Sequence, residues 1–272
     1  MIVAIDIGGT KTLVALFDSS EKKINETRFE TPQKYSEFIK VLSDNLKTLK
    51  INKDDIVVFS APGKLDRTKG IGIAFGNLPW KNVNIVKDIE KLTGATTLFE
   101  NDANLAGLSE AHQIKPLPHR AVYITFSTGI GSGIITDGII DPDMVDSEAG
   151  EMLFEHENHL RCWEEFASGK AIVKKYGKKA SEIDDMSIWQ KITLNFAIGI
   201  INICAVIEPD VIIIGGSVGS YFTKYQDCLI KNLREIKPPL VEVPNIIQAK
   251  LPEEAVIYGC VTLAKQYLNE QH

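Results

Sequence analysis

The chain has 272 residues, of which 44% are hydrophobic, and its formal net charge is −6 at pH 7. It is long enough to bury a sizeable core as one large domain or two ordinary ones, and we favour two. Its lysines and arginines are scattered, so the basic stripe typical of a nucleic-acid-binding protein is missing.

Cysteine usage and hydropathy indicate the cellular setting. The four cysteines lie far apart and form no CxxC pair, which argues against a disulfide framework and a zinc knuckle. The first apolar run is short and contains Asp6, unlike a signal peptide. The most apolar region, residues 195–216, is interrupted at 208–210 and predicts a buried helix and a buried strand. We therefore expect a cytoplasmic protein that binds neither nucleic acid nor membrane.

Predicted strands alternate with predicted helices, which is the α/β pattern, and a hairpin opens each half, which predicts mixed sheets. The strands are expected at about residues 2–7, 12–18, 56–60, 96–99, 121–126, 133–136 and 211–214. The helices are expected near residues 33–49, 84–93, 102–112, 163–176, 188–207, 219–235 and 253–269.

An internal similarity links the two hairpins. Residues 4–18, AIDIGGTKTLVALFD, align without a gap with residues 123–137, YITFSTGIGSGIITD. Each segment is an apolar strand, a turn of small residues and a second apolar strand. The match is one of pattern more than of identity. It predicts two similar lobes.

The turn of the first hairpin has the composition of a phosphate-binding loop. Gly8 and Gly9 have no side chains to obstruct a ligand, and their N–H groups can face an anion. Thr10 and Lys11 add a hydroxyl and a cation. The spacing fits neither a Walker A loop nor a GxGxxG turn, because a strand follows. By itself, a glycine turn that only closes a hairpin explains the residues about as well.

Two further glycine sites favour nucleotide binding. Thr128 and Gly129 belong to STGIGSG, residues 127–133, which repeats the same chemistry in the second hairpin. Gly215 and Gly216 follow a buried strand, at the end where α/β sheets bind ligands. The alternative is an ordinary turn that only connects a strand to a helix. Together the sites predict two loops that hold one polyphosphate and a third that contacts adenosine.

An ordered set of motifs resembles the ROK family of sugar kinases over nearly the whole chain. The motifs are DIGGTK (6–11), APG (61–63), GNLPWKN (76–82), ENDANLAGLSEA (100–111), STGIGSG (127–133), EAGE (148–151), ASG (167–169) and PDVIIIGG (209–216). The resemblance implies an α/β fold of the two-lobed actin-like ATPase type, which is hexokinase-type and ribonuclease H-like, with mixed sheets.

The same resemblance implies roles on the sugar side. Asp102 matches the catalytic aspartate, which would orient a sugar hydroxyl and accept its proton. A helix cap is the alternative for Asn101 and Asp102, and Asn101 can cap the helix while it also contacts the sugar. Trp80 is expected to pack. The other implied sugar-binding residues are Gly63, Asn77, Glu148 and Glu164, and each glutamate taken singly would more often be a surface residue.

On the nucleotide side the resemblance implies ATP with Mg²⁺. Asp6 matches the first-strand aspartate that helps to organise the magnesium nucleotide, and a charge within an apolar strand is costly without a partner. We expect the Mg²⁺ to be held mostly through water. The implied nucleotide contacts are Asp6, Gly8, Gly9, Thr10, Lys11, Thr128, Gly129, Gly215 and Gly216.

One segment departs from the family pattern, in which a histidine and a CxCGxxGC segment form a structural zinc site. Here Glu151 stands in the place of the histidine beside the sugar, and Cys162 alone remains of the cysteines. His156, His159 and Cys162 fit no standard zinc spacing, so we expect no zinc and an exposed polar loop. An ionised Glu151 only accepts hydrogen bonds, which leaves the exact sugar open. The apolar candidates to hold this loop by packing are Phe154, Leu160, Trp163 and Phe166.

We therefore predict an ATP-dependent kinase that phosphorylates a hydroxyl of a hexose such as glucose. A kinase of an N-acetylated hexosamine is the alternative, and behind it a non-catalytic sugar-sensing regulator. The family's repressors carry a helix-turn-helix ahead of the first strand, whereas that strand here begins at the N-terminus. We expect an N-terminal lobe over residues 1–114, with a helix at 251–272 packing back on it, and a C-terminal lobe over 115–250. The family also implies a homodimer.

Overall fold

The computed structural model describes residues 1–251 and 254–271. The chain forms two compact units, Met1–Ser109 with Glu254–His272, and Glu110–Glu253. The expected helix at residues 253–269 is α9 (Ala255–Glu270) in the first unit. Residues 252, 253 and 272, which the expected C-terminal segment included, lie outside the described residues.

The first unit is built on a mixed five-stranded sheet. Its strands run in the order β3 (Lys23–Glu30), β2 (Lys11–Phe17), β1 (Ile2–Ile7), β4 (Ile56–Ala61) and β8 (Thr96–Asn101). β1 to β3 are antiparallel neighbours, whereas β1, β4 and β8 are parallel. The carboxyl ends of β1, β4 and β8 therefore meet at one edge of the sheet.

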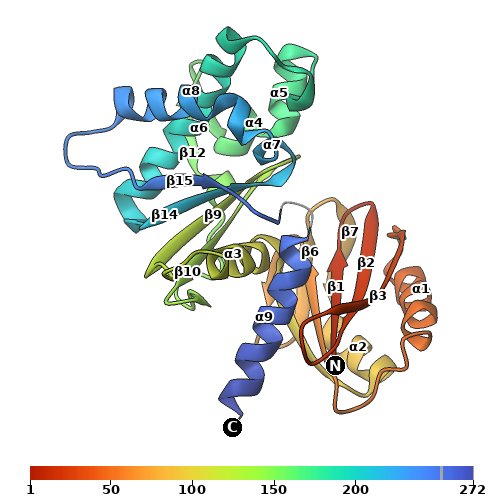
Figure 1. Cartoon of the computed structure of the whole chain (residues 1–272). Coiled ribbons are helices and arrows are strands. Elements are labelled where there is room, and N and C mark those ends of the chain that lie inside the picture. Colours follow the sequence, from red (N-terminus) through yellow and green to blue (C-terminus); the bar gives the residue numbers. More distant parts are fainter. Residues whose placement is uncertain (252–253, 272) are drawn as a thin grey trace. The chain divides into compact units, whose positions relative to one another are not determined.

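Helices cover both faces of this sheet (Figure 1). One apolar cluster joins the sheet to α1 (Tyr35–Lys47), α2 (Ile85–Thr93) and a small antiparallel sheet of β5 (Lys64–Asp66), β6 (Ile71–Phe75) and β7 (Leu78–Val83). The other cluster joins it to α3 (Asp102–His112) and α9. Trp80 is buried in the first cluster, as predicted for a packing residue.

The second unit repeats this plan. Its sheet has the order β11 (Ile139–Ile140), β10 (Ile130–Thr136), β9 (Arg120–Phe126), β14 (Val211–Gly215) and β15 (Asn245–Gln248). β9 to β11 are antiparallel, and β9, β14 and β15 are parallel. β1–β2 and β9–β10 thus hold the same place in two sheets of one topology, which confirms the repeat predicted from residues 4–18 and 123–137.

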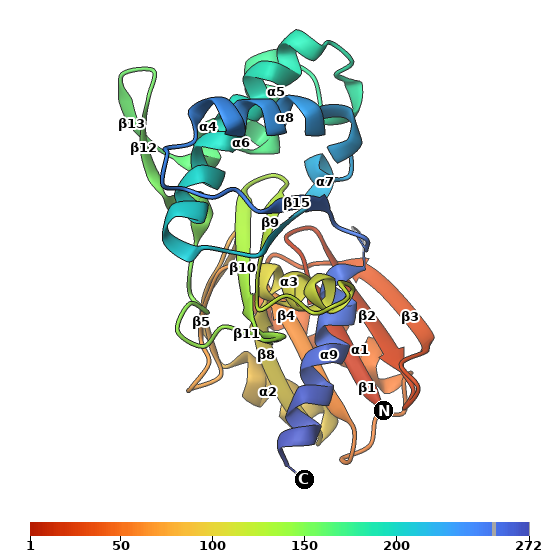
Figure 2. The ribbon, with the colours of Figure 1, turned by 60° about the vertical axis from the view of Figure 1, so that its left-hand side comes forward.

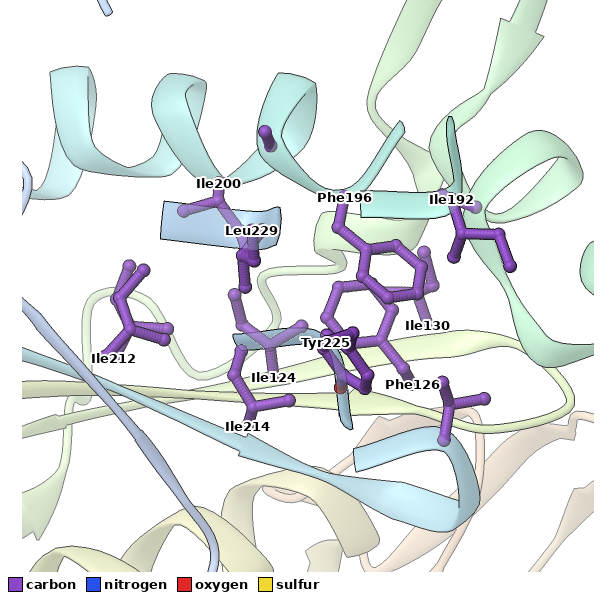
Figure 3. Packing of buried hydrophobic residues seen from close by; sticks show 14 of the residues in the cluster. Ile124, Phe126, Ile130, Ile192, Phe196, Ile200, Ile212, Ile214, Tyr225 and Leu229 are labelled. Carbon is purple, nitrogen blue, oxygen red and sulfur yellow. The ribbon is translucent and has the colours of Figure 1, made fainter. Parts of the chain in front are cut away.

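The core of the second unit lies between its sheet and its helices (Figure 3). These are α4 (Trp163–Ala167), α5 (Gly169–Tyr176), α6 (Met186–Ile207), α7 (Gly216–Gly219) and α8 (Phe222–Ile236), with 3₁₀ turns at Ala149–Glu151 and Ala180–Glu182. α6 is long and apolar enough to cross a membrane by length and composition, but half of its apolar window is buried. Since Phe196 and Ile200 pack against the sheet, α6 serves as a core helix.

Several elements differ from the prediction. The hairpin of β12 (Leu153–His156) and β13 (His159–Cys162) replaces the expected exposed polar loop, and Figure 2 shows it projecting from the helices of its unit. The helix expected at 163–176 is two helices, because Ser168 Oγ accepts a hydrogen bond from the Ala171 N–H and caps α5. β3, β5 to β7, β11, β15 and the short helix α7 were not predicted.

Candidate active site

Two carboxylates lie near the carboxyl edge of the first sheet. Asp6 lies on the same face of β1 as the buried Ile2 and Ala4, near the carboxyl end of the strand. Ser60 of the neighbouring strand β4 is paired with Asp6 in the sheet. Ser60 Oγ donates to Asp6 Oδ1 at 2.5 Å. Burial raises the pKa of Asp6, and this hydrogen bond opposes the rise. The buried Ser60 thus provides the partner that a carboxylate in an apolar strand needs.

Asp102 is the first residue of α3, directly after β8. Burial raises the pKa of its carboxyl from 3.8 to about 6, and the negative charge of Asp6 adds to the rise. A carboxylate with a pKa near 6 is mostly ionised at pH 7 and yet basic enough to accept a proton from a bound hydroxyl. The carboxylate is therefore suited to general base catalysis.

Asn101 caps α3, as the sequence suggested. Its Oδ1 accepts from the Ala103 N–H at 2.8 Å and the Asn104 N–H at 3.4 Å, which satisfies donors that a helix start leaves free. Its Nδ2 donates to the Gly63 carbonyl at 3.4 Å. The structure thus brings three predicted sugar-side residues together, namely Gly63, Asn101 and Asp102.

The β1–β2 turn is a tight hairpin turn stabilised by hydrogen bonds within the first unit. The Gly8 N–H donates to the Lys11 carbonyl at 3.0 Å, and Thr31 Oγ1 donates to the Gly8 carbonyl at 2.8 Å. A Cβ on Gly9 would lie 3.3 Å from Cβ of Asn77, which places this predicted sugar residue beside the turn. Thr10 and Lys11 are exposed. The expectation that the Gly8 N–H faces an anion was wrong, because this N–H closes the hairpin by donating to the Lys11 carbonyl. The exposed hydroxyl and ammonium groups of Thr10 and Lys11 remain accessible to a ligand.

In the second unit, Glu164 supports the turn between β9 and β10. Its Oε2 accepts from the Ile130 N–H at 3.1 Å, and a Cβ on Gly129 would collide with the same carboxylate. The Gly169 N–H donates to the Ser127 carbonyl at 2.7 Å from the other side. This predicted sugar residue therefore lies against Gly129, a predicted phosphate contact next to Thr128.

The Glu148–Glu151 turn packs against the same hairpin. A Cβ on Gly150 would collide with the Ile130 carbonyl, and the Ala149 N–H donates to Ser132 Oγ at 3.2 Å. Cys162 Sγ donates to Glu151 Oε2 at 3.3 Å. In this unit the structure therefore gathers Glu148, Glu151 and Glu164 around the β9–β10 hairpin.

A cavity of about 360 Å³ adjoins the β9–β10 turn. Gly216 has φ +80°, and a Cβ there would collide with the Phe126 carbonyl, so this position requires glycine. Gly215 packs as closely against Tyr123. The cavity is lined by hydroxyl, apolar and cationic side chains, among them Thr128, Ser217, Val218, Lys170, Lys179 and Tyr221. Of these, only Thr128 was predicted, because the sequence motifs ended at Gly169 and Gly216 and gave no signal for the side chains that follow them.

The residues of the β12–β13 hairpin do not fit the zinc site of the family pattern. Cys162 lies opposite Leu153, whereas His156 lies opposite His159, three residues or about 10 Å along the strand. Zinc ligands lie only about 2 Å from one ion. The hydrogen bond to Glu151 also raises the pKa of the Cys162 thiol, which disfavours the thiolate that zinc needs. Among residues 1–251 and 254–271, no group of three or more metal-ligating side chains is found.

Packing of the hairpin and of α4, which follows it, differs from the prediction in one residue. Trp163 and Phe166 are buried and Phe154 is partly buried, as expected. His156 stacks on Phe166 with ring centroids 4.2 Å apart. Leu160 is 70% exposed, so the prediction that it holds the segment by packing was wrong. The two-stranded pairing directs it outward, and no sequence period signalled that pairing.

The matched sheets, each with a glycine turn in its first hairpin, define an actin-like ATPase fold. The chain belongs to the ROK family, whose model matches residues 2–267. It is 28% identical to a fructokinase from Lactococcus lactis subsp. cremoris, over 79% of this chain and 78% of that protein. It is 24% identical to a glucokinase from Thermotoga maritima, over 97% of each. It is 26% identical to an N-acetyl-D-glucosamine kinase from Histophilus somni, over 97% of this chain and 98% of that protein.

Solved structures share the fold along nearly the whole chain. A ROK family glucokinase from Streptomyces griseus in complex with glucose and AMPPNP superposes with a TM-score of 0.82 at 21% identity, covering 97% of this chain and 99% of that one. A ROK family transcriptional regulator superposes with a TM-score of 0.77 at 17% identity, covering 97% and 80%. Since an enzyme and a regulator share this fold, function depends on the residues of the site.

Proposed function

We propose that this protein is an ATP-dependent kinase that transfers the γ-phosphate of ATP to a hydroxyl of a hexose such as glucose. The observation that carries the proposal is the placement of the Asp102 carboxylate at the start of α3, next to Asn101, which donates to the Gly63 carbonyl. Its pKa of about 6 is compatible with the role of a general base. The glucokinase and fructokinase relatives support a hexose as the acceptor.

In the proposed reaction, Asp102 accepts the proton of the sugar hydroxyl while the oxygen of that hydroxyl forms a bond to the γ-phosphorus. The bond from that phosphorus to the bridging oxygen breaks, and ADP leaves. Asn101 and Gly63 would orient the sugar from the first unit, with Asn77 beside them. We also propose that Glu148, Glu151 and Glu164 accept hydrogen bonds from ring hydroxyls.

We propose nucleotide contacts at the glycine turn of each unit. Thr10 and Lys11 offer a hydroxyl and a cation in the first unit, and Thr128 offers a hydroxyl beside the 360 Å³ cavity of the second. We assign that cavity to the adenosine, next to Gly215 and Gly216. Mg²⁺ would neutralise phosphate charge, and Asp6 is the carboxylate that would organise it, mostly through bound water. We further propose that the two structural units are the two lobes, and that the protein is a cytoplasmic homodimer without zinc.

A coupled ADP-release assay with a panel of sugars tests the proposal. The panel contains glucose, fructose, mannose, N-acetylglucosamine and N-acetylmannosamine, each with ATP and Mg²⁺. Turnover that is fastest with a plain hexose supports the proposal, whereas preference for an acetylated sugar replaces it with the hexosamine alternative. Sugar binding without ADP release for any sugar would instead indicate a sugar-sensing regulator.

A further inference from the structure

An unassigned ion pair lies beside the start of α3. Glu100 of β8 is 5% exposed and lies opposite Ser60 of β4 in the sheet register. Arg67, from the turn between β5 and β6, donates through Nε to its Oε2 at 2.7 Å and through Nη2 to its Oε1 at 2.5 Å. Such a bidentate ion pair fixes both the distance between the two side chains and their relative orientation.

The same carboxylate binds groups on both sides of Asp102. Glu100 Oε1 accepts from the Asn101 N–H at 2.6 Å and from Asn104 Nδ2 at 2.9 Å. Asp102 lies between these two residues in the first turn of α3. The Glu100 carboxylate therefore contacts the residue before Asp102 and a residue two positions after it, at the start of α3.

The guanidinium of Arg67 ties a second segment to this point. Arg67 follows β5, in the chain segment that begins with Gly63, and Asn101 donates to the Gly63 carbonyl. Two sets of hydrogen bonds therefore join the segments: Arg67 donates to Glu100, and Asn101 donates to the Gly63 carbonyl. Together they hold the segment of residues 63–67 and the start of α3 in one fixed arrangement.

We propose that Arg67 and Glu100 are positioning residues, which hold Asn101 against the Gly63 carbonyl and fix the start of α3, so that a sugar hydroxyl meets the Asp102 carboxylate in the correct orientation. This inference rests on the proposed function. Neither residue needs to touch the substrate, since they act through Asn101 and Asp102. A displacement of about 1 Å in a reacting group can lower a rate about 100-fold.

The test compares Arg67→Met with Lys69→Met. Lys69 belongs to the same turn but forms an exposed pair with Asp66, at 3.0 Å and with 71% of its side chain accessible, so it is a matched control. We expect Arg67→Met to lower kcat by about 100-fold with unchanged ATP affinity. Lys69→Met should stay within about twofold of wild type. Wild-type kcat in Arg67→Met would overturn the proposal.

A double variant separates positioning from stability. Arg67→Met alone leaves a buried carboxylate without its cation and should lower the melting temperature, whereas Arg67→Met with Glu100→Gln removes both charges. We expect the double variant to recover melting temperature while kcat stays low. Recovery of kcat together with melting temperature would show a merely structural pair.

Hydrogen exchange supplies a readout that does not need turnover. The Ala103 and Asn104 amides, which donate to Asn101, should exchange faster in Arg67→Met and in the double variant than in Lys69→Met. Unchanged exchange at these amides would overturn the proposal. If the wild-type protein phosphorylated no sugar, the proposed function would be wrong. The hydrogen-exchange comparison of Arg67→Met with Lys69→Met would still decide whether the Arg67–Glu100 pair positions the start of α3.

Discussion

Replacing Asp102 by Asn should lower activity and raise stability at the same time. The variant keeps an oxygen that can accept from the Ala103 N–H, as Oδ1 of Asp102 does at 2.8 Å, but it cannot accept a proton. General base catalysis typically contributes about 100- to 10,000-fold, so we expect a loss of that size in kcat. ATP affinity should change little, because the lost group acts on the sugar hydroxyl.

The stability effect follows from the raised pKa. A carboxyl whose pKa is higher in the folded protein binds protons more tightly there, so the free energy of unfolding decreases as the pH rises from about 4 to about 6. The rise from 3.8 to about 6 corresponds to at most about 3 kcal/mol at about 1.4 kcal/mol per unit. The neutral amide of the variant carries no such cost, so Asp102→Asn should unfold at a higher temperature at pH 7.5.

The assay measures sugar phosphorylation and thermal unfolding of both proteins between pH 4 and pH 8. Wild-type kcat should fall as the pH drops below about 6, since the protonated base is inactive. The stability advantage of the variant should vanish near pH 4. Wild-type turnover by Asp102→Asn would remove this residue from the mechanism, and a variant that is less stable at pH 7.5 would refute the assigned pKa.

Three further outcomes are expected. Gly9→Val places a branched side chain at the β1–β2 turn, where even a Cβ atom would lie 3.3 Å from Cβ of Asn77. Titration with a non-hydrolysable ATP analogue should therefore show sharply weaker binding. Normal binding by the folded variant would contradict a phosphate role for this turn. Gly129→Ala should reduce both sugar and nucleotide affinity, because its methyl group would displace the Glu164 carboxylate, and unaltered titrations of both ligands would argue against that coupling. Metal analysis of purified protein should find no stoichiometric zinc, and chelation followed by Mg²⁺ addition should leave activity and melting temperature unchanged; one tightly bound zinc per chain, with Cys162 among its ligands, would reverse this prediction.

Local patterns were sufficient to predict the framework. The first hairpin of each sheet was found because apolar strands and glycine turns are encoded by neighbouring residues, and β1, β4 and β9 are nearly continuous apolar runs. The helix cap at Asn101 was predicted for the same reason. β3 was missed because it is an edge strand with mostly exposed and half-buried residues, and the β12–β13 hairpin because it is exposed and lacks a turn motif.

The sequence by itself determined the family, the glycine turns and the identity of the candidate base, because each depends on residue types at short, ordered spacings. Only the tertiary structure decided what surrounds them. The pairing of Arg67 with Glu100 joins residues 33 positions apart, and the contact of Glu164 with Ile130 joins residues 34 positions apart. The pKa of Asp102 likewise depends on burial and on the charge of Asp6 from β1. Such effects arise from distances in space, which no local spacing along the chain specifies.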